Sequence, residues 1–158
     1  MHNIHPLFVH FPIALLLAAL IIDLAAVIFK HPAWHQAAFW NLVLATAAAA
    51  LAVWSGLQAE GTAAHPEQAH EIIELHEKLG IAVLFLAAFA TLCRITWRNH
   101  FTGIKKVLVL ALMVLSAATV SFGAYLGGRL VYEFGVGGDF GHVHQGAAEE
   151  PPHHHHHE

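Results

Sequence analysis

Residues 8–29 read FVHFPIALLLAALIIDLAAVIF, a long apolar run that carries a single carboxylate, Asp23. An α-helix needs about 20 predominantly apolar residues to cross the hydrocarbon core of a bilayer. Three more apolar stretches of suitable length follow at residues 39–57, 80–97 and 107–126. The chain is therefore predicted to be an integral membrane protein with four transmembrane helices.

The composition supports the same interpretation. Hydrophobic residues make up 57% of the 158 residues and charged residues 11%, whereas soluble domains carry about 25% charged residues. Short connections between the spans predict an all-α fold, one antiparallel four-helix bundle over residues 1–138 with no separate soluble domain. The first span is expected to be retained, because it contains Asp23 and no basic residue precedes it, unlike a signal peptide.

The distribution of lysine and arginine predicts the orientation, because these residues concentrate in cytoplasmic loops. Only Lys78 and Arg129 lie in the second connection and the C-terminal segment. Both termini and the second connection are thus predicted to face outward, into the periplasm for a bacterial inner membrane. The other basic residues flank the first and third connections: Lys30, Arg94, Arg98, Lys105 and Lys106.

The third helix is expected to extend beyond the bilayer. Pro66 suits the first position of a helix, and the helix should run unbroken from there to about Asn99. Along this helix His76 falls on an apolar stripe that faces the bundle, with Gly80 one turn further on. Glu74 and Lys78 lie on the polar face as a favourable i,i+4 pair.

The start of the first helix is predicted from its prolines. Pro12 suits the first helical turn, which places His10 at or just before the helix start. His5 precedes a proline and is therefore expected to be extended. Asp23 lies deeper in this span, where carboxylates are costly and usually have partners. A structural contact with Arg94 or Asn41, at comparable depth, is favoured over a proton relay.

The fourth span ends in Gly123-x-x-x-Gly127, a spacing of small residues that lets helices approach closely. Arg129 and Glu133 follow four residues apart, which favours an intrahelical ion pair. Residues 139–158 are polar and rich in histidine, and they are predicted to form a disordered tail. The run at 153–157 would bind metal ions whatever its biological role.

Three segments together resemble one family. They are HPLFVHFP at residues 5–12, LHEKLG at 75–80 and GGRLVYEFGVG at 127–137. They are similar to the four-helix bacterial membrane proteins catalogued as domain of unknown function 2231, over about residues 5–138. The resemblance implies the four-span fold and marks motif positions, but it implies no activity. Those positions are His5, His10, His76, Arg129 and Glu133.

Histidine is abundant, with 16 residues against seven lysines and arginines. Imidazole is a common ligand of haem iron and of divalent metal ions. A collection of histidines at helix ends therefore suggests a bound metal or metal cofactor. Of the eleven histidines outside the tail run, eight fall in segments predicted to face outward: His2, His5, His10, His65, His70, His76, His142 and His144.

The first functional hypothesis is a haem b site near the outward face, since bundle cores are common places for cofactors. His10 and His76 would be the axial ligands, with His5 or His70 as a substitute. Such a protein would be an electron carrier rather than a stand-alone enzyme. It would exchange electrons with a membrane or periplasmic partner.

Neighbouring residues suit such a cofactor. Ala14, Gly80 and Gly127 would leave room for a flat ring, and Arg129 would pair with a propionate, because guanidinium matches carboxylate geometry. Tyr132 or Trp54 would pack against the ring or hydrogen-bond to it. The simpler interpretation is that His10 and His76 are helix-end residues that hydrogen-bond the backbone or Glu133.

Two other classes of function stay open. The first is a metal-binding or metal-transport protein that holds Zn, Cu or Ni through His10, His76, His5 and His70. The second is a cofactor-free assembly or scaffold subunit, since small-residue helix faces suit homo-oligomers. The sequence shows no hydrolytic triad, phosphate loop or nucleic-acid patch. The partner that its apolar spans indicate most directly is the lipid bilayer.

Overall fold

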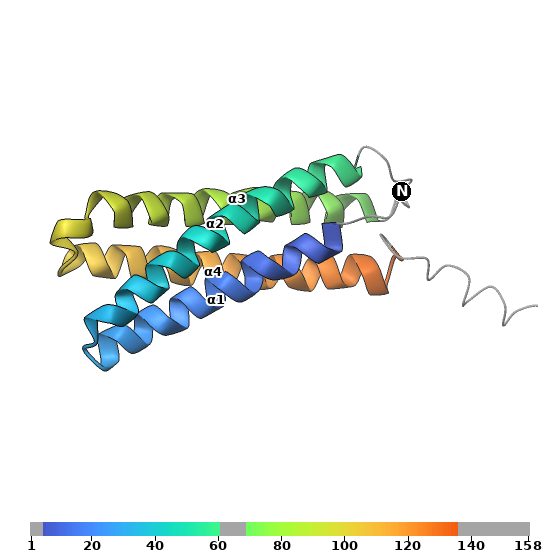
Figure 1. The fold of residues 1–158 in the computed structure, drawn as a ribbon. Helices are drawn as coiled ribbons and strands as arrows, with labels where there is room; N and C mark the ends of the chain where they lie inside the picture. Colours follow the sequence, from blue (N-terminus) through green and yellow to red (C-terminus); the bar gives the residue numbers. More distant parts are fainter. Residues whose placement is uncertain (1–4, 61–68, 136–158) are drawn as a thin grey trace, which may run out of the picture.

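The computed structural model describes residues 5–60 and 69–135, which form four long α-helices and one short 3₁₀ helix (Figure 1). Each of the four α-helices is long and apolar enough to cross a membrane. This confirms the predicted all-α, four-span fold. The elements are α1 (His5–Ile28), α2 (Pro32–Glu60), α3 (His70–Thr96), η2 (Arg98–His100) and α4 (Ile104–Tyr132).

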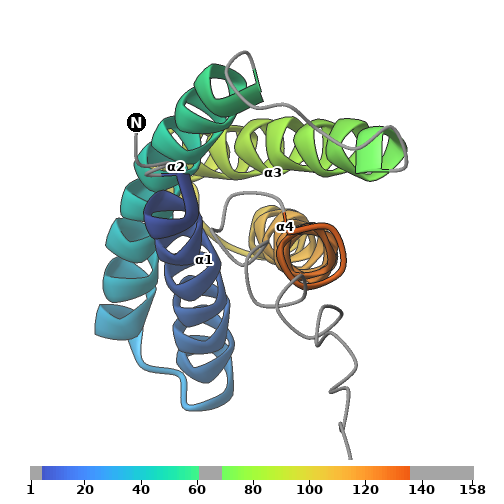
Figure 2. The same cartoon turned by 90° about the vertical axis from the view of Figure 1, so that its right-hand side faces the viewer.

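The four helices form a closed ring of neighbours. α1 and α3 each pack against both α2 and α4, and the most extensive contact joins α1 to α2. Figure 1 shows that the α1–α2 hairpin lies obliquely across the α3–α4 hairpin, and Figure 2 views the same arrangement along the bundle. We call the end that holds the start of α1 and the end of α4 the termini end. The opposite end, where the α1–α2 and α3–α4 connections lie, is the connection end.

Both connections at that end are tight. Phe29 N–H donates to the Ala25 carbonyl at 2.9 Å, and Lys30 adopts a left-handed conformation with φ 53°, as residues just past a helix end often do. Pro32 then opens α2, where its missing N–H removes no helical hydrogen bond. Before α4, Gly103 has φ 54°, a conformation that glycine adopts without a steric penalty.

The interior of the bundle is built largely from alanine. Fully buried alanines recur along α1, α2 and α3, for example Ala19, Ala45 and Ala87. Small side chains let the helix backbones approach closely, so that van der Waals contact holds the helices together where lipid offers no hydrophobic contrast. Thr46 of α2 and Thr91 of α3 add a hydrogen bond of 3.0 Å between the hairpins.

The outer surface is apolar, as expected for helices in contact with lipid. Large hydrophobic side chains on every helix are exposed, including Ile21, Leu51, Phe85 and Val114. A soluble protein would rarely leave so much contiguous apolar surface uncovered. Together with the four candidate spans, this surface identifies the chain as a membrane protein.

Two predicted helix boundaries were wrong. α1 already begins at His5, so that residue is helical rather than extended, and Pro12 lies inside the helix. In a bilayer an unpaired backbone group is costly, and losing one hydrogen bond at a proline costs less than ending the helix. α3 ends at Thr96 rather than near Asn99, and η2 follows. Its predicted start at Pro66 lies outside the described residues, as does the tail 139–158.

Packing in the interior can be tested with two leucines of α2. Leu42 is fully buried, whereas Leu44 is 56% exposed. We expect Leu42→Ala to lower the free energy of unfolding by about 2–3 kcal/mol, because it leaves a cavity that the neighbouring helices cannot close. Unfolding in detergent, followed by circular dichroism, measures the change. Leu44→Ala is the matched control, and an equal loss in both variants would contradict the buried position of Leu42.

Candidate functional sites at the two ends of the bundle

The three motif segments meet at the termini end. Figure 1 shows the start of α1, the start of α3 and the end of α4 at the same end of the bundle. Position 10 therefore lies in the same region as position 76, but on diagonally related helices, since α1 and α3 occupy opposite corners of the ring. The orientation of each side chain decides what this end can bind.

His76 points into the bundle, as its apolar stripe predicted. Its Nδ1 lies 2.9 Å from the Gly123 carbonyl oxygen of α4. A carbonyl only accepts, so Nδ1 is the protonated nitrogen, and in the neutral ring Nε2 then carries the lone pair. Gly127 makes room for the ring, because a Cβ at this position would lie 3.1 Å from His76 Cε1. The small residues of α4 thus form a slot for one imidazole.

His10 lies on the outer side of α1. Its side chain is exposed, as is Ala14 one turn further on, whereas Pro12, Leu16 and Ala19 are buried. A step of two residues turns an α-helix by about 200°, so His10 and the packed stripe of α1 face in nearly opposite directions. The structure does not turn His10 toward His76.

The other predicted residues are dispersed around this end. Gly80 faces α2, where a Cβ would meet Val53 at 3.8 Å in ordinary contact. His70 is exposed at the first residue of α3, and Tyr132 is 91% exposed at the end of α4. His5 is the first residue of α1, and its side chain lies outside the described part. Gly80 and Gly127 therefore face different neighbours rather than one shared space.

Arg129 and Glu133 form the predicted intrahelical ion pair. Arg129 Nε donates to Glu133 Oε1 at 2.9 Å, and Nη2 donates to Oε2 at 2.7 Å. These hydrogen bonds hold the pKa of the Glu133 carboxyl below its usual range. Glu74 and Lys78 form the other predicted pair at 2.7 Å. Both pairs lie on exposed helix surfaces, where such pairs add little stability.

A bare-ion site finds no support among the described residues. Across 5–60 and 69–135, no group of three or more His, Cys, Asp or Glu residues lies close enough together to hold a metal ion.

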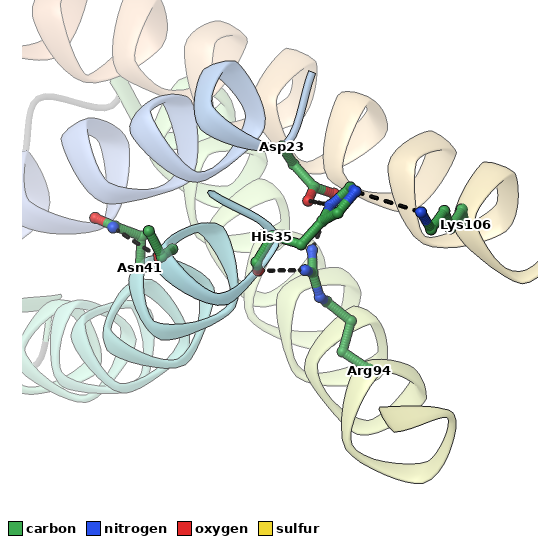
Figure 3. Close-up of polar contacts among 6 residues, drawn as sticks. Asp23, His35, Asn41, Arg94 and Lys106 are labelled. Atoms are coloured by element: carbon green, nitrogen blue, oxygen red, sulfur yellow. Dashed lines mark hydrogen bonds and ion pairs between the residues drawn. The ribbon is translucent and has the colours of Figure 1, made fainter. Parts of the chain in front are cut away.

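The most elaborate polar site lies at the connection end, around Asp23 (Figure 3). Asp23 Oδ1 is 2.7 Å from His35 Nδ1, and Oδ2 is 2.9 Å from Arg94 Nη1. Arg94 Nη2 donates to the His35 backbone carbonyl at 2.6 Å. Lys106 Nζ lies 3.4 Å from His35 Nε2. Each of the four helices therefore contributes one residue, and we call these four residues the Asp23 cluster.

The Asp23–Arg94 ion pair of the cluster is shielded from solvent. Asp23 and Arg94 are 2% and 6% exposed, and the Phe101 ring lies 4.7 Å from the Arg94 guanidinium carbon. The Nη1–Oδ2 contact is an ion pair without hydrogen-bond geometry, since buried Nη1 has no hydrogen-bond partner among the described residues. Removing one partner of such a buried pair leaves an uncompensated charge, which is far more costly than losing an exposed pair.

Of the two partners predicted for Asp23, one is confirmed. Arg94 contacts Asp23, whereas Asn41 donates to the Ala37 carbonyl of its own helix at 3.0 Å. Sequence reasoning missed His35 and Lys106. The sequence did contain a signal for these two residues. Asp23 and His35 lie at similar distances on either side of the first connection, and Arg94 and Lys106 do so around the third. An antiparallel hairpin brings such positions to the same depth.

Comparison with known proteins gives one result. A family model described as Predicted membrane protein (DUF2231) matches residues 1–139. No curated protein and no solved structure matches the chain.

The buried ion pair can be tested by removing its partners in turn. We expect Arg94→Met to lower the free energy of unfolding by about 3–5 kcal/mol, because it strands the buried Asp23 carboxylate. The double variant Asp23→Leu, Arg94→Met removes both charges and should recover at least half of that loss. Thermal unfolding in detergent measures both variants, with Arg129→Met in the exposed pair as the control. A double variant less stable than Arg94→Met would refute the pairing.

Proposed function

Because the chain belongs to the DUF2231 family of predicted membrane proteins, whose description names no activity, we propose a function from its geometry. We propose that the protein binds haem b at the termini end of the bundle, with His76 as an axial ligand, and carries electrons. The supporting observation is the way His76 is held. Its Nδ1 bonds the Gly123 carbonyl, and its ring fills the slot at Gly127.

This arrangement is the one that metal-ligating histidines usually have. Such a histidine donates its second ring N–H to a carbonyl or carboxylate, which fixes the tautomer and turns the lone pair of the other nitrogen toward the metal. His76 meets this requirement through Gly123. A bound haem would supply one-electron redox chemistry, and the residues of the chain would orient it and set its exposure.

The second ligand would come from the first turns of α1. His10 fits poorly, since it faces away from the packed stripe of α1. His5, at the start of the same helix, is the substitute ligand that the sequence suggests. Arg129, already paired with Glu133, would have to exchange that partner for a propionate.

An absorption spectrum of the detergent-purified protein tests the proposal. The experiment uses the full chain with the tail histidines 153–157 replaced by serine, so that the tail does not bind haem. We expect a Soret band after haem reconstitution and a shift of the bands on reduction. His76→Ala and Gly127→Val should each lose most of the bound haem, the second because its added methyl groups displace the His76 ring.

Matched variants distinguish the alternatives. His100→Ala, at the exposed connection end, should leave the spectrum unchanged. Of His5→Ala and His10→Ala, the one that converts the bound haem from six-coordinate to five-coordinate identifies the second ligand. A protein without a Soret band, even after reconstitution, would overturn the haem proposal. Stoichiometric Zn, Cu or Ni in that sample would favour a metal-handling protein instead.

We expect the termini end, with the proposed haem site, to face outward, and fusion proteins test this orientation. The excess of basic residues at the connection end supports a cytoplasmic location for it. We expect alkaline phosphatase fused at the C-terminus to be active and green fluorescent protein at the same point to be dark. Fusions truncated after residue 102 should show the reverse. An inactive C-terminal phosphatase would place the proposed haem site on the cytoplasmic side.

A further inference from the structure

The hydrogen bonds of the Asp23 cluster define the protonation of His35. An ammonium group has only donors, so at the 3.4 Å contact Lys106 Nζ donates and His35 Nε2 accepts. The proton of the neutral ring must then be on Nδ1, which donates to Asp23 Oδ1 at 2.7 Å. His35 thus lies between a carboxylate and an ammonium group. Its Nδ1 contacts Asp23, and its Nε2 contacts Lys106.

His35 is the group in the cluster suited to change its charge near neutral pH. Imidazole is the side chain whose ordinary titration falls between pH 5 and 8, whereas the arginine guanidinium stays protonated. The charged groups in contact with His35 are Asp23 from α1, Arg94 from α3 and Lys106 from α4. Its side chain is 16% exposed, so that water can deliver a proton.

A proton on Nε2 would affect the two sides of the ring differently. The contact with Asp23 would remain, because Nδ1 still donates to the carboxylate. The contact with Lys106 would be lost, because a protonated imidazole has no acceptor and two cations would then lie 3.4 Å apart. Lys106 links α4 to the cluster through this contact, so its displacement removes a link between the first turn of α4 and α2.

We propose that His35 is a proton-binding site of the connection end, and that proton binding releases Lys106 and loosens the start of α4 from α2. The site takes its proton from the aqueous phase at this end, which is the cytoplasm in the predicted orientation. It is independent of the proposed haem site at the opposite end.

Nuclear magnetic resonance of the full chain, with isotope-labelled histidine in detergent micelles, tests the proposal. The His35 signals are those that disappear in His35→Asn, whose amide keeps a donor toward Asp23. We expect the His35 signals to change with pH as the ring takes up a proton. In Lys106→Met the midpoint of this change should differ from that of the wild type, because the variant removes the ammonium group in contact with the ring. A His35 ring that stays neutral throughout, or an unchanged midpoint, would overturn the proposal.

Hydrogen exchange at the start of α4 supplies a second readout. At pH 5.5 backbone amides 104–109 should exchange several-fold faster in the wild-type protein than in His35→Asn at the same pH. At pH 7.5 the two proteins should exchange equally. His100→Asn, an exposed histidine at the same end, should behave like the wild type. Equal exchange of wild type and His35→Asn at pH 5.5 would show that proton binding, if it occurs, does not move α4.

Discussion

The carboxylate of Asp23 constrains the whole connection end, because an ionised group buried in an apolar bundle needs partners on every side. One oxygen is held by His35 from α2 and the other by Arg94 from α3, while Lys106 of α4 reaches the far side of the imidazole. The position of each helix at this end is therefore fixed relative to the other three. The alanine-rich packing of the bundle operates within that constraint, since small residues allow close approach but specify little about register.

The termini end is built on a different principle. There ion pairs such as Arg129 with Glu133 lie on the helix surfaces, and in the interior the His76 imidazole contacts the α4 backbone. That ring is held by a backbone carbonyl and by the space at a glycine of the same helix. The two ends thus differ in what they offer chemically, a charged network at one and an oriented imidazole at the other.

The sequence predicted those features that depend on local patterns. Span positions follow from long apolar runs, and the inward direction of His76 follows from helical periodicity within one segment. The predictions failed where two elements must be combined. His35 and Lys106 look like ordinary helix-end residues until the hairpins place them beside Asp23, and Pro12 suggested a helix start that the membrane environment overrides. The helix was predicted to begin beside His10. The sequence therefore did not predict that the His10 side chain points away from the bundle.

The order in which the partners of Asp23 are synthesised has a consequence for biogenesis. A charged side chain at the centre of a membrane helix raises the cost of insertion by about 2.5–3.5 kcal/mol, and α1 emerges from the ribosome before any partner of Asp23. His35 follows twelve residues later, whereas Arg94 lies two helices further on. The α1–α2 hairpin is therefore the smallest unit in which Asp23 has a partner, and α3 later supplies the arginine that completes the ion pair.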